Sequence, residues 1–195
     1  MASLIEACFF PLEGVVFFPS ATLPLNIFEP RYLSMTDHLF QHGMPLVLSD
    51  LDPTDPESWS PGKSLIAGMG AVHLFEQRQD GTRVILVRGT SRVRLVSVLE
   101  DKPFIRCQVE PLFDEAELHP GNLFFLQRLK QGLNQWAEET LPDAESRQAF
   151  QGGLENPQKV VELYSHYRVQ DVDIRQQILE VSDINRRIDL LRRVL

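Results

Sequence analysis

The sequence predicts an α+β protein in which a β-rich part, an antiparallel barrel that is closed or partly closed, precedes a helical part. Three observations carry this prediction. Short apolar runs broken by proline, glycine and aspartate fill the chain up to about Phe113, as is typical of strands. Asp80-Gly81 is a hairpin-turn signal between two of these runs. After Phe113 the apolar residues recur at spacings of three and four, the period of a helix. We therefore expect two parts, residues 1–113 and 114–195.

The β-rich part is expected to hold at least six short strands around one short helix. The strand-like runs cover residues 2–10, 14–18, 24–28, 45–48, 65–75, 84–87, 93–99 and 104–112. Asp80-Gly81 suits a type I′ turn, because Asp and Gly tolerate positive φ angles. Pro30 favours the first position of a helix, and Gly43 is a signal for its end. Residues 50–63 are rich in proline, aspartate and serine and are expected to form a loop.

The helical part begins with a strongly periodic segment and ends with an arginine-rich one. The first helix carries its apolar residues at Leu123, Leu126, Leu129, Leu133 and Trp136. A weaker helix is expected over 142–153, and three more begin at the capping signals Asn156-Pro157, Asp173 and either Ser182 or Asp183. The last helix carries Arg186, Arg187, Arg192 and Arg193, and arginine is favourable near a helix C-terminus.

Composition excludes several classes of protein. The 195 residues carry a net charge of −8, spread evenly along the chain, which argues against binding that depends on neutralising phosphates. No apolar run approaches the roughly 20 residues of a membrane span, and no basic, signal-like start is present. We expect a soluble cytoplasmic protein. Cys8 and Cys107 lie in apolar runs and are expected to be buried free thiols.

Partial motifs for chemistry are present, and each lacks an essential residue. Pro61–Ser64 ends like a phosphate-binding loop, but Glu57 stands where that loop needs glycine. Gly89–Val93 begins like a nucleophile elbow and lacks the closing glycine. His38 and His42 have the spacing of metal ligands, without the glutamate of a zinc peptidase or an evident third ligand. The sequence therefore indicates no catalytic, cofactor-binding or metal-binding residue.

Four segments, in order, carry a family resemblance. They are Phe10–Leu25 continued by Ile27-Phe28-Glu29-Pro30-Arg31-Tyr32, then Ile66–Val72, Asp80–Leu95 and Asn156–Arg187. Together they resemble the N-terminal, substrate-recognising domain of Lon-type proteases, in the form found in stand-alone bacterial relatives. The resemblance implies a PUA-like β-barrel followed by a helical bundle, the two lobes together forming one such domain. It also implies recognition of unfolded or tagged polypeptide.

In full-length Lon an ATPase and a serine–lysine peptidase follow this domain, whereas this sequence ends at Leu195. The resemblance therefore implies a non-catalytic substrate-recognition module without cofactors, and an adaptor in protein quality control that serves a separate protease or chaperone. Two other functions remain open: RNA binding, which PUA-like barrels often perform, and small-molecule catalysis in a pocket of the barrel. Both a monomer and a homodimer remain open.

The candidate peptide-binding residues are Leu25, Phe28, Glu29, Arg31 and Tyr32. Two interpretations of them are open. In the first, the apolar members build the barrel core and Arg31 pairs with a carboxylate to hold the helix in place. In the second, they belong to a groove between barrel and helices that accepts hydrophobic peptide segments, with Arg31 and Tyr32 at its rim.

Overall fold

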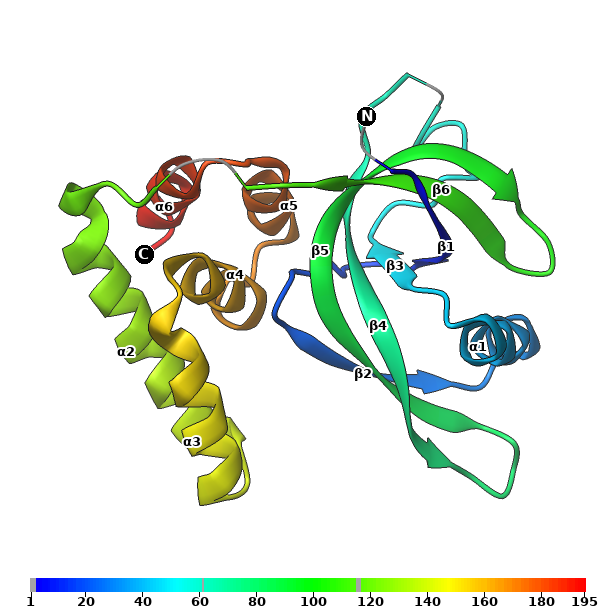
Figure 1. Ribbon diagram of the computed structural model, residues 1–195, viewed down its shortest axis with the longest axis horizontal. Coiled ribbons are helices and arrows are strands. Elements are labelled where there is room, and N and C mark those ends of the chain that lie inside the picture. Colours follow the sequence, from blue (N-terminus) through cyan, green and yellow to red (C-terminus); the bar gives the residue numbers. More distant parts are fainter. Residues whose placement is uncertain (1–2, 61, 115–116) are drawn as a thin grey trace. The chain divides into compact units, whose positions relative to one another are not determined.

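The computed structural model describes residues 3–60, 62–114 and 117–195, and the chain divides into two compact units, Met1–Leu112 and Phe113–Leu195 (Figure 1). Ala2 and Pro61, which belong to an expected strand and to the partial phosphate-loop motif, lie outside the described residues. Each unit has its own set of buried apolar side chains. The expected mixed α+β class is confirmed.

The first unit holds one sheet and one helix. Its elements are β1 (Ile5–Pro11), β2 (Thr22–Ile27), α1 (Pro30–His42), β3 (Leu46–Ser49), β4 (Ile66–Gln77), β5 (Arg83–Glu100) and β6 (Ile105–Leu112). The strands lie in the order β2-β5-β4-β3-β1-β6, and β5 also pairs with β6. The 18 residues of β5 allow this, because its first half pairs with β2 and its second half with β6.

Two expectations about the strands are wrong. The sheet is not wholly antiparallel, because β1 and β3 run parallel, with Cys8 opposite Leu46 and Phe10 opposite Leu48. The chain between them passes through β2 and α1, and such a long crossover is what parallel neighbours need. In addition, the two runs expected over 84–87 and 93–99 are one continuous strand, β5.

Residues 14–18 are also not a strand, although Val16, Phe17 and Phe18 are buried. This segment crosses the backbone of two other strands at their glycines. A Cβ atom on Gly68 would lie 2.0 Å from the carbonyl oxygen of Phe17, and one on Gly89 would lie 2.2 Å from that of Phe18. The apolar run therefore reflects burial against the sheet and not membership of it.

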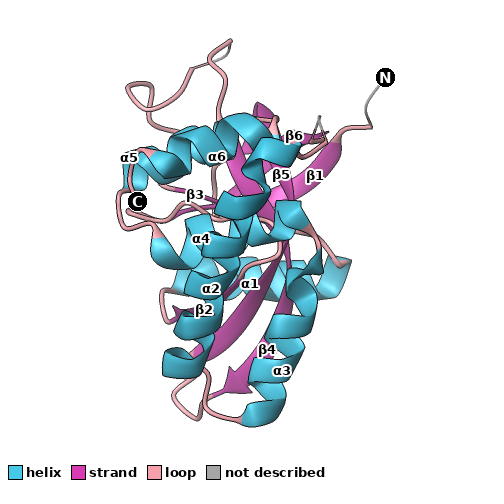
Figure 2. Cartoon of the chain, turned by 90° about the vertical axis from the view of Figure 1, so that its left-hand side faces the viewer, coloured by secondary structure: helices cyan, strands magenta, loops and turns pink. Residues whose placement is uncertain are grey.

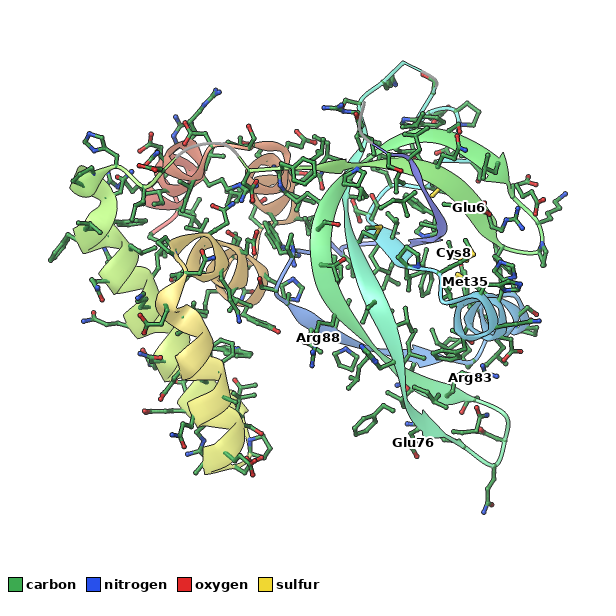
Figure 3. The ribbon with its side chains drawn as sticks, viewed as in Figure 1. Glu6, Cys8, Met35, Glu76, Arg83 and Arg88 are labelled. Atoms are coloured by element: carbon green, nitrogen blue, oxygen red, sulfur yellow. The ribbon has the colours of Figure 1, made fainter. Side chains whose placement is uncertain are left out.

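Helix α1 begins and ends as the sequence predicts. Pro30 occupies its first turn, and Gly43 ends it with φ at 63°. The side chain of Arg83, on β5, holds the middle of the helix: its Nη1 donates to Thr36 Oγ1 at 3.0 Å and lies 2.6 Å from Asp37 Oδ1 (Figure 3).

The hairpin between β4 and β5 is confirmed, but its turn is not type I′. A type I′ turn needs positive φ at both central residues. Gly81 has φ at 87°, while Ser20 is the only non-glycine residue with positive φ in the described part of the chain. Gly81 N–H donates to the Arg78 carbonyl at 3.1 Å, and Arg78 N–H donates to the Thr82 carbonyl at 2.9 Å. One glycine thus closes a three-residue loop.

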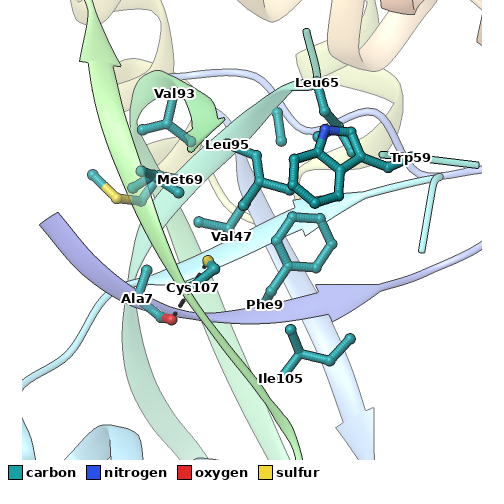
Figure 4. Close-up of a cluster of buried hydrophobic side chains, with 12 residues drawn as sticks. Ala7, Phe9, Val47, Trp59, Leu65, Met69, Val93, Leu95, Ile105 and Cys107 are labelled. Atoms are coloured by element: carbon teal, nitrogen blue, oxygen red, sulfur yellow. Dashed lines mark hydrogen bonds between the residues drawn. The ribbon is translucent and has the colours of Figure 1, made fainter. Parts of the chain in front are cut away.

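One cluster of buried side chains in the first unit lies among β1, β3, β4, β5 and β6 (Figure 4). Its members include Phe9, Val47, Leu95, Ile105 and Cys107. Trp59 joins them from the proline-rich loop, with its indole N–H donating to the Lys63 carbonyl at 2.9 Å. The loop has no regular structure in its described residues, as expected, and Trp59 anchors it to the core.

The second unit is helical (Figure 2). Its α-helices are α2 (Leu123–Thr140), α3 (Ala144–Gly152), α4 (Pro157–Arg168), α5 (Val172–Glu180) and α6 (Ile184–Arg192), with 3-10 turns at Pro120–Asn122 and Gly153–Glu155. Asn156 and Asp183 cap α4 and α6 as expected. The cap of α5 is Asp171 and not Asp173, because the Asp171 carboxylate accepts the Ile174 N–H at 3.0 Å while Asp173 already lies in the first turn.

Candidate functional site

The candidate residues meet where β2 ends and α1 begins. Phe28, Glu29 and Arg31 are exposed there, and Phe28 is the most exposed of the large apolar side chains between β1 and α1, at 66%. Leu25 differs from the others, because it lies opposite Ile85 of β5 with 9% of its surface exposed. It supports this region from the core and does not offer its own surface.

A pocket of about 290 Å³ and another of about 210 Å³ open on the surface of the first unit, and the smaller one contains three of the candidates. Its floor comes from the end of β1, with Phe10, and from Ile27 of β2. Phe28, Glu29 and Tyr32 complete its wall. The lining is therefore apolar with a few polar groups at its edge, which is the composition of a site that binds an apolar group.

Aromatic and cationic contacts hold Tyr32 in place. Its ring centroid lies 4.2 Å from that of Phe10, and the Arg31 guanidinium carbon lies 5.1 Å from the centre of the Tyr32 ring. Such a cation–π contact is worth about 0.5–1 kcal/mol at an exposed site. In the described residues Arg31 makes no ion pair, so the carboxylate pairing of the first interpretation is not observed there.

The surroundings of Tyr32, and burial above all, favour the protonated form of its hydroxyl. Burial raises the pKa of Tyr32, the Arg31 guanidinium opposes that rise, and the carboxylates of Glu29 and Asp52 add to it. A neutral phenol can both donate and accept a hydrogen bond. The pocket therefore pairs an apolar floor with one hydroxyl suited to a backbone carbonyl or amide.

The larger pocket was missed by sequence reasoning. The C-terminal end of α1, with Leu39 and Phe40, forms one side of it, and Val72 of β4 lies on another. Phe40, Leu74 and Phe75 are exposed around this part of the unit. The available signal was the run Val72–Phe75, in which three of four residues are apolar at the outer end of an expected strand.

The other motifs do not come together as chemistry. The ring centroids of His38 and His42 lie 4.2 Å apart with the rings tilted by 35°, and His42 Nδ1 lies 3.0 Å from the His38 carbonyl oxygen. Burial and the neighbouring cations lower the pKa of His38. No group of three or more metal-ligating side chains occurs among the described residues. Cys8 and Cys107 are free and buried, as expected.

Within the described part of the chain, every helix is too short or too polar to cross a membrane.

The family model and similar curated proteins point to the same family. The family model described as "ATP-dependent protease La (LON) substrate-binding domain" matches residues 6–195, and so extends over both units. The chain is 24% identical over 192 residues to Lon protease 2 of Desulfotalea psychrophila, covering 95% of this chain and 24% of that protein. It is 23% identical to Lon protease 2 of Syntrophobacter fumaroxidans over 89% of this chain. The chain thus spans about a quarter of the length of these curated relatives.

Solved structures show the same fold. A Lon N-terminal domain protein from Xanthomonas campestris matches with a TM-score of 0.68 and 23% identity, covering 96% of both chains. The N-terminal domain of a Mycobacterium avium complex Lon protease matches with a TM-score of 0.67 and 14% identity, covering 95% of both chains.

Proposed function

Since the chain belongs to the family of the ATP-dependent protease La (LON) substrate-binding domain, we propose that it is a non-catalytic module that binds unfolded polypeptide through exposed apolar side chains. The family match over residues 6–195 carries this proposal. The pocket beside Tyr32 supports it, because an apolar floor flanked by an exposed phenylalanine suits a hydrophobic side chain of a client.

The proposed binding residues are Phe28, Glu29, Arg31 and Tyr32, with Leu25 as their support. Phe28 covers an incoming apolar side chain and loses its own exposed surface in doing so. Glu29 and the Tyr32 hydroxyl bond the backbone of the bound segment. Arg31 keeps the Tyr32 ring oriented through its stacking contact.

The PUA-like barrel belongs to the same proposal. A ring of pairings through β5, β4, β3, β1, β6 and back to β5 supports it. We also propose that the two units act as one domain, and the family model supports this because it extends across both. We further propose an adaptor role in which the module presents clients to a separate protease or chaperone.

A matched pair of phenylalanine substitutions tests the site. Phe28→Ser removes the apolar side chain at the pocket, while Phe124→Ser removes an even more exposed one, at 86%, from α2 of the other unit. Binding of a fluorescent, unstructured apolar peptide is followed by anisotropy. Burying a phenylalanine is worth about 1.5–3 kcal/mol, so Phe28→Ser should weaken binding by roughly tenfold or more. Phe124→Ser should leave it unchanged, and equal loss in both variants would remove the pocket from the proposal.

A further inference from the structure

One edge of β4 is left without a partner strand. β3 pairs with β4 only over Gly68–Gly70, whereas β5 accompanies β4 as far as Gln77. Along Ala71–Gln77, the edge that faces away from β5 has no strand beside it among the described residues. Glu76, labelled in Figure 3, marks the outer end of this edge. Unpaired edges are templates for strand addition, and native proteins usually block them with proline, lysine or a bulge.

The hydrogen-bond alternation identifies the backbone groups that point outward. Gly89 N–H donates to the Ala21 carbonyl at 2.8 Å. Because alternate residues of a strand bond the same neighbour, residues 87, 85 and 83 of β5 also direct their backbone N–H and C=O groups toward β2. Leu86 and Arg88 therefore bond β4, at His73 and Ala71. It follows that Val72 and Leu74 direct their N–H and C=O groups away from β5, toward the free edge.

The two edges of this part of the sheet differ. On β2, the backbone groups that point away from β5 belong to Thr22, Pro24 and Asn26. Pro24 has no N–H to donate, so it interrupts that edge. The β4 edge contains no proline and no lysine, and its bulge lies only at Phe75, beyond Leu74. The β4 edge is thus the one that can accept another strand.

An apolar surface lies beside the same residues. Val72 and Leu74 are paired with Val87 and Ile85, so their side chains share the face on which Ile85 and Val87 are buried. Val72 contributes to the pocket of about 290 Å³ next to Leu39 and Phe40 of α1, and Leu74 continues the apolar surface with 51% of its area exposed. Pockets for drug-sized ligands measure about 300–1,000 Å³, so this one suits a single large side chain.

We propose that an extended polypeptide segment adds to this edge as a strand, bonds the backbone of Val72 and Leu74, and places one apolar side chain in the pocket beside Phe40. The inference rests on the proposed function for the class of ligand, and it adds a second contact surface. In this binding mode, hydrogen bonds to the peptide backbone contribute more than contacts with particular side chains. A second copy of this chain is a poorer occupant. If the same edges of two copies paired, Val72 of each copy would line its own pocket, and no side chain would enter the pocket of the other copy.

Two isomeric peptides test the mode of binding. A fluorescent peptide of alternating leucine and threonine is compared with two versions N-methylated at every leucine or at every threonine. In an added strand only one of these sets of amides faces β4. One isomer should therefore bind at least about tenfold more weakly than the unmodified peptide while the other binds nearly as well.

A protein variant gives the complementary result. Val72→Pro removes an outward N–H, whereas Val72→Thr changes the same side chain and retains that N–H. The proline variant should therefore bind the same peptide at least about tenfold more weakly than the threonine variant. If Val72→Pro fails to fold, the isomeric peptides decide alone. Equal affinity of both isomers and the parent peptide would overturn strand addition, and so would dimerisation of this chain that excludes the peptide. Loss of binding in Phe28→Ser together with equal affinity of the isomers would leave the Tyr32 pocket standing without the edge. A peptide that does not bind at all would overturn both.

Discussion

Gly68 is a single residue on which the packing of the first unit depends. The backbone carbonyl of Phe17 lies where its Cβ would be, at 2.0 Å, and a backbone atom yields less easily than the end of a side chain. Gly68→Ala should therefore lower the free energy of unfolding by more than about 2 kcal/mol, as overpacking in a core does. Urea denaturation measures this. Gly152→Ala is the control, because nothing lies within 4 Å of its added Cβ and its φ is −60°. That variant should be unchanged or slightly more stable.

The two thiols give a second residue-scale prediction. Burial raises the pKa of Cys8 and of Cys107 to about 12 each, whereas an unfolded thiol has a pKa of about 8.5. A disulfide reagent at pH 8 should therefore react roughly a thousandfold more slowly with the folded protein than with the chain in urea. The folded state retains protons that the unfolded chain releases. The stability from these thiols is thus complete below about pH 8.5 and declines between there and about pH 12. Rapid labelling of either cysteine under native conditions would contradict this burial.

At the scale of elements, Arg187 ties α6 to the rest of the second unit. Its side chain is 1% exposed, its Nη2 lies 2.7 Å from Asp114 Oδ1, and its Nε donates to the Val181 carbonyl at 2.6 Å. The buried Glu162 of α4 lies 4.0 Å from its Nη1. One guanidinium therefore connects α6 with α4, with the segment before α2 at Asp114, and with the α5–α6 connection at Val181.

Arg187→Leu should destabilise the helical unit strongly, because it leaves the buried carboxylate of Glu162 without its cation. Removing one partner of a buried pair costs about 3–5 kcal/mol. Loss of helical circular dichroism in a urea titration measures the effect. Arg186→Leu changes the exposed neighbour and should stay within about 0.5 kcal/mol of the parent protein. Similar losses in the two variants would mean that the contacts of Arg187 do not hold the helices together.

Elements with strong local signals could be predicted from the sequence. Helix α1 has proline at its start and a left-handed glycine at its end, and both act within a single turn. Properties that depend on distant residues were not predictable. The parallel pairing of β1 with β3, the coil at Phe17 and the continuity of β5 are all decided by neighbours far along the chain. Likewise, the terminal arginines look alike in sequence, yet Arg187 lies buried near the start of α6 while Arg193 ends it.

The candidate site shows the same division. Phe28, Glu29 and Tyr32 are close in sequence and also line one pocket, so a local pattern was enough to group them as candidates. Phe10 of β1 also lines that pocket, and residues of β4 and α1 together line the larger pocket. Both arrangements depend on tertiary contacts. The exposed run Val72–Phe75 was visible in the sequence, but its missing partner strand was not.

At the scale of the whole molecule, charge separates the proposed function from RNA binding. The chain carries a net charge of −8, and burial of apolar side chains does not release counterions. The affinity for an uncharged apolar peptide should therefore change less than about twofold between 50 and 500 mM salt, whereas RNA binding through several phosphates falls by orders of magnitude over a similar range. Anisotropy titrations with the peptide and with a single-stranded RNA measure both. A steep salt dependence combined with tight RNA binding would favour the RNA-binding alternative.

The proposed function requires that this chain bind polypeptide whose apolar side chains and backbone amides are exposed, as they are in an unfolded client. The test measures equilibrium binding of the full chain to one protein whose fold depends on disulfides, in its native form and in a form permanently unfolded by reduction and carboxymethylation. The unfolded form exposes apolar side chains and free backbone amides, and it should bind while the native form does not. Equal binding of the two forms, or binding of neither, would show that the chain does not recognise unfolded polypeptide.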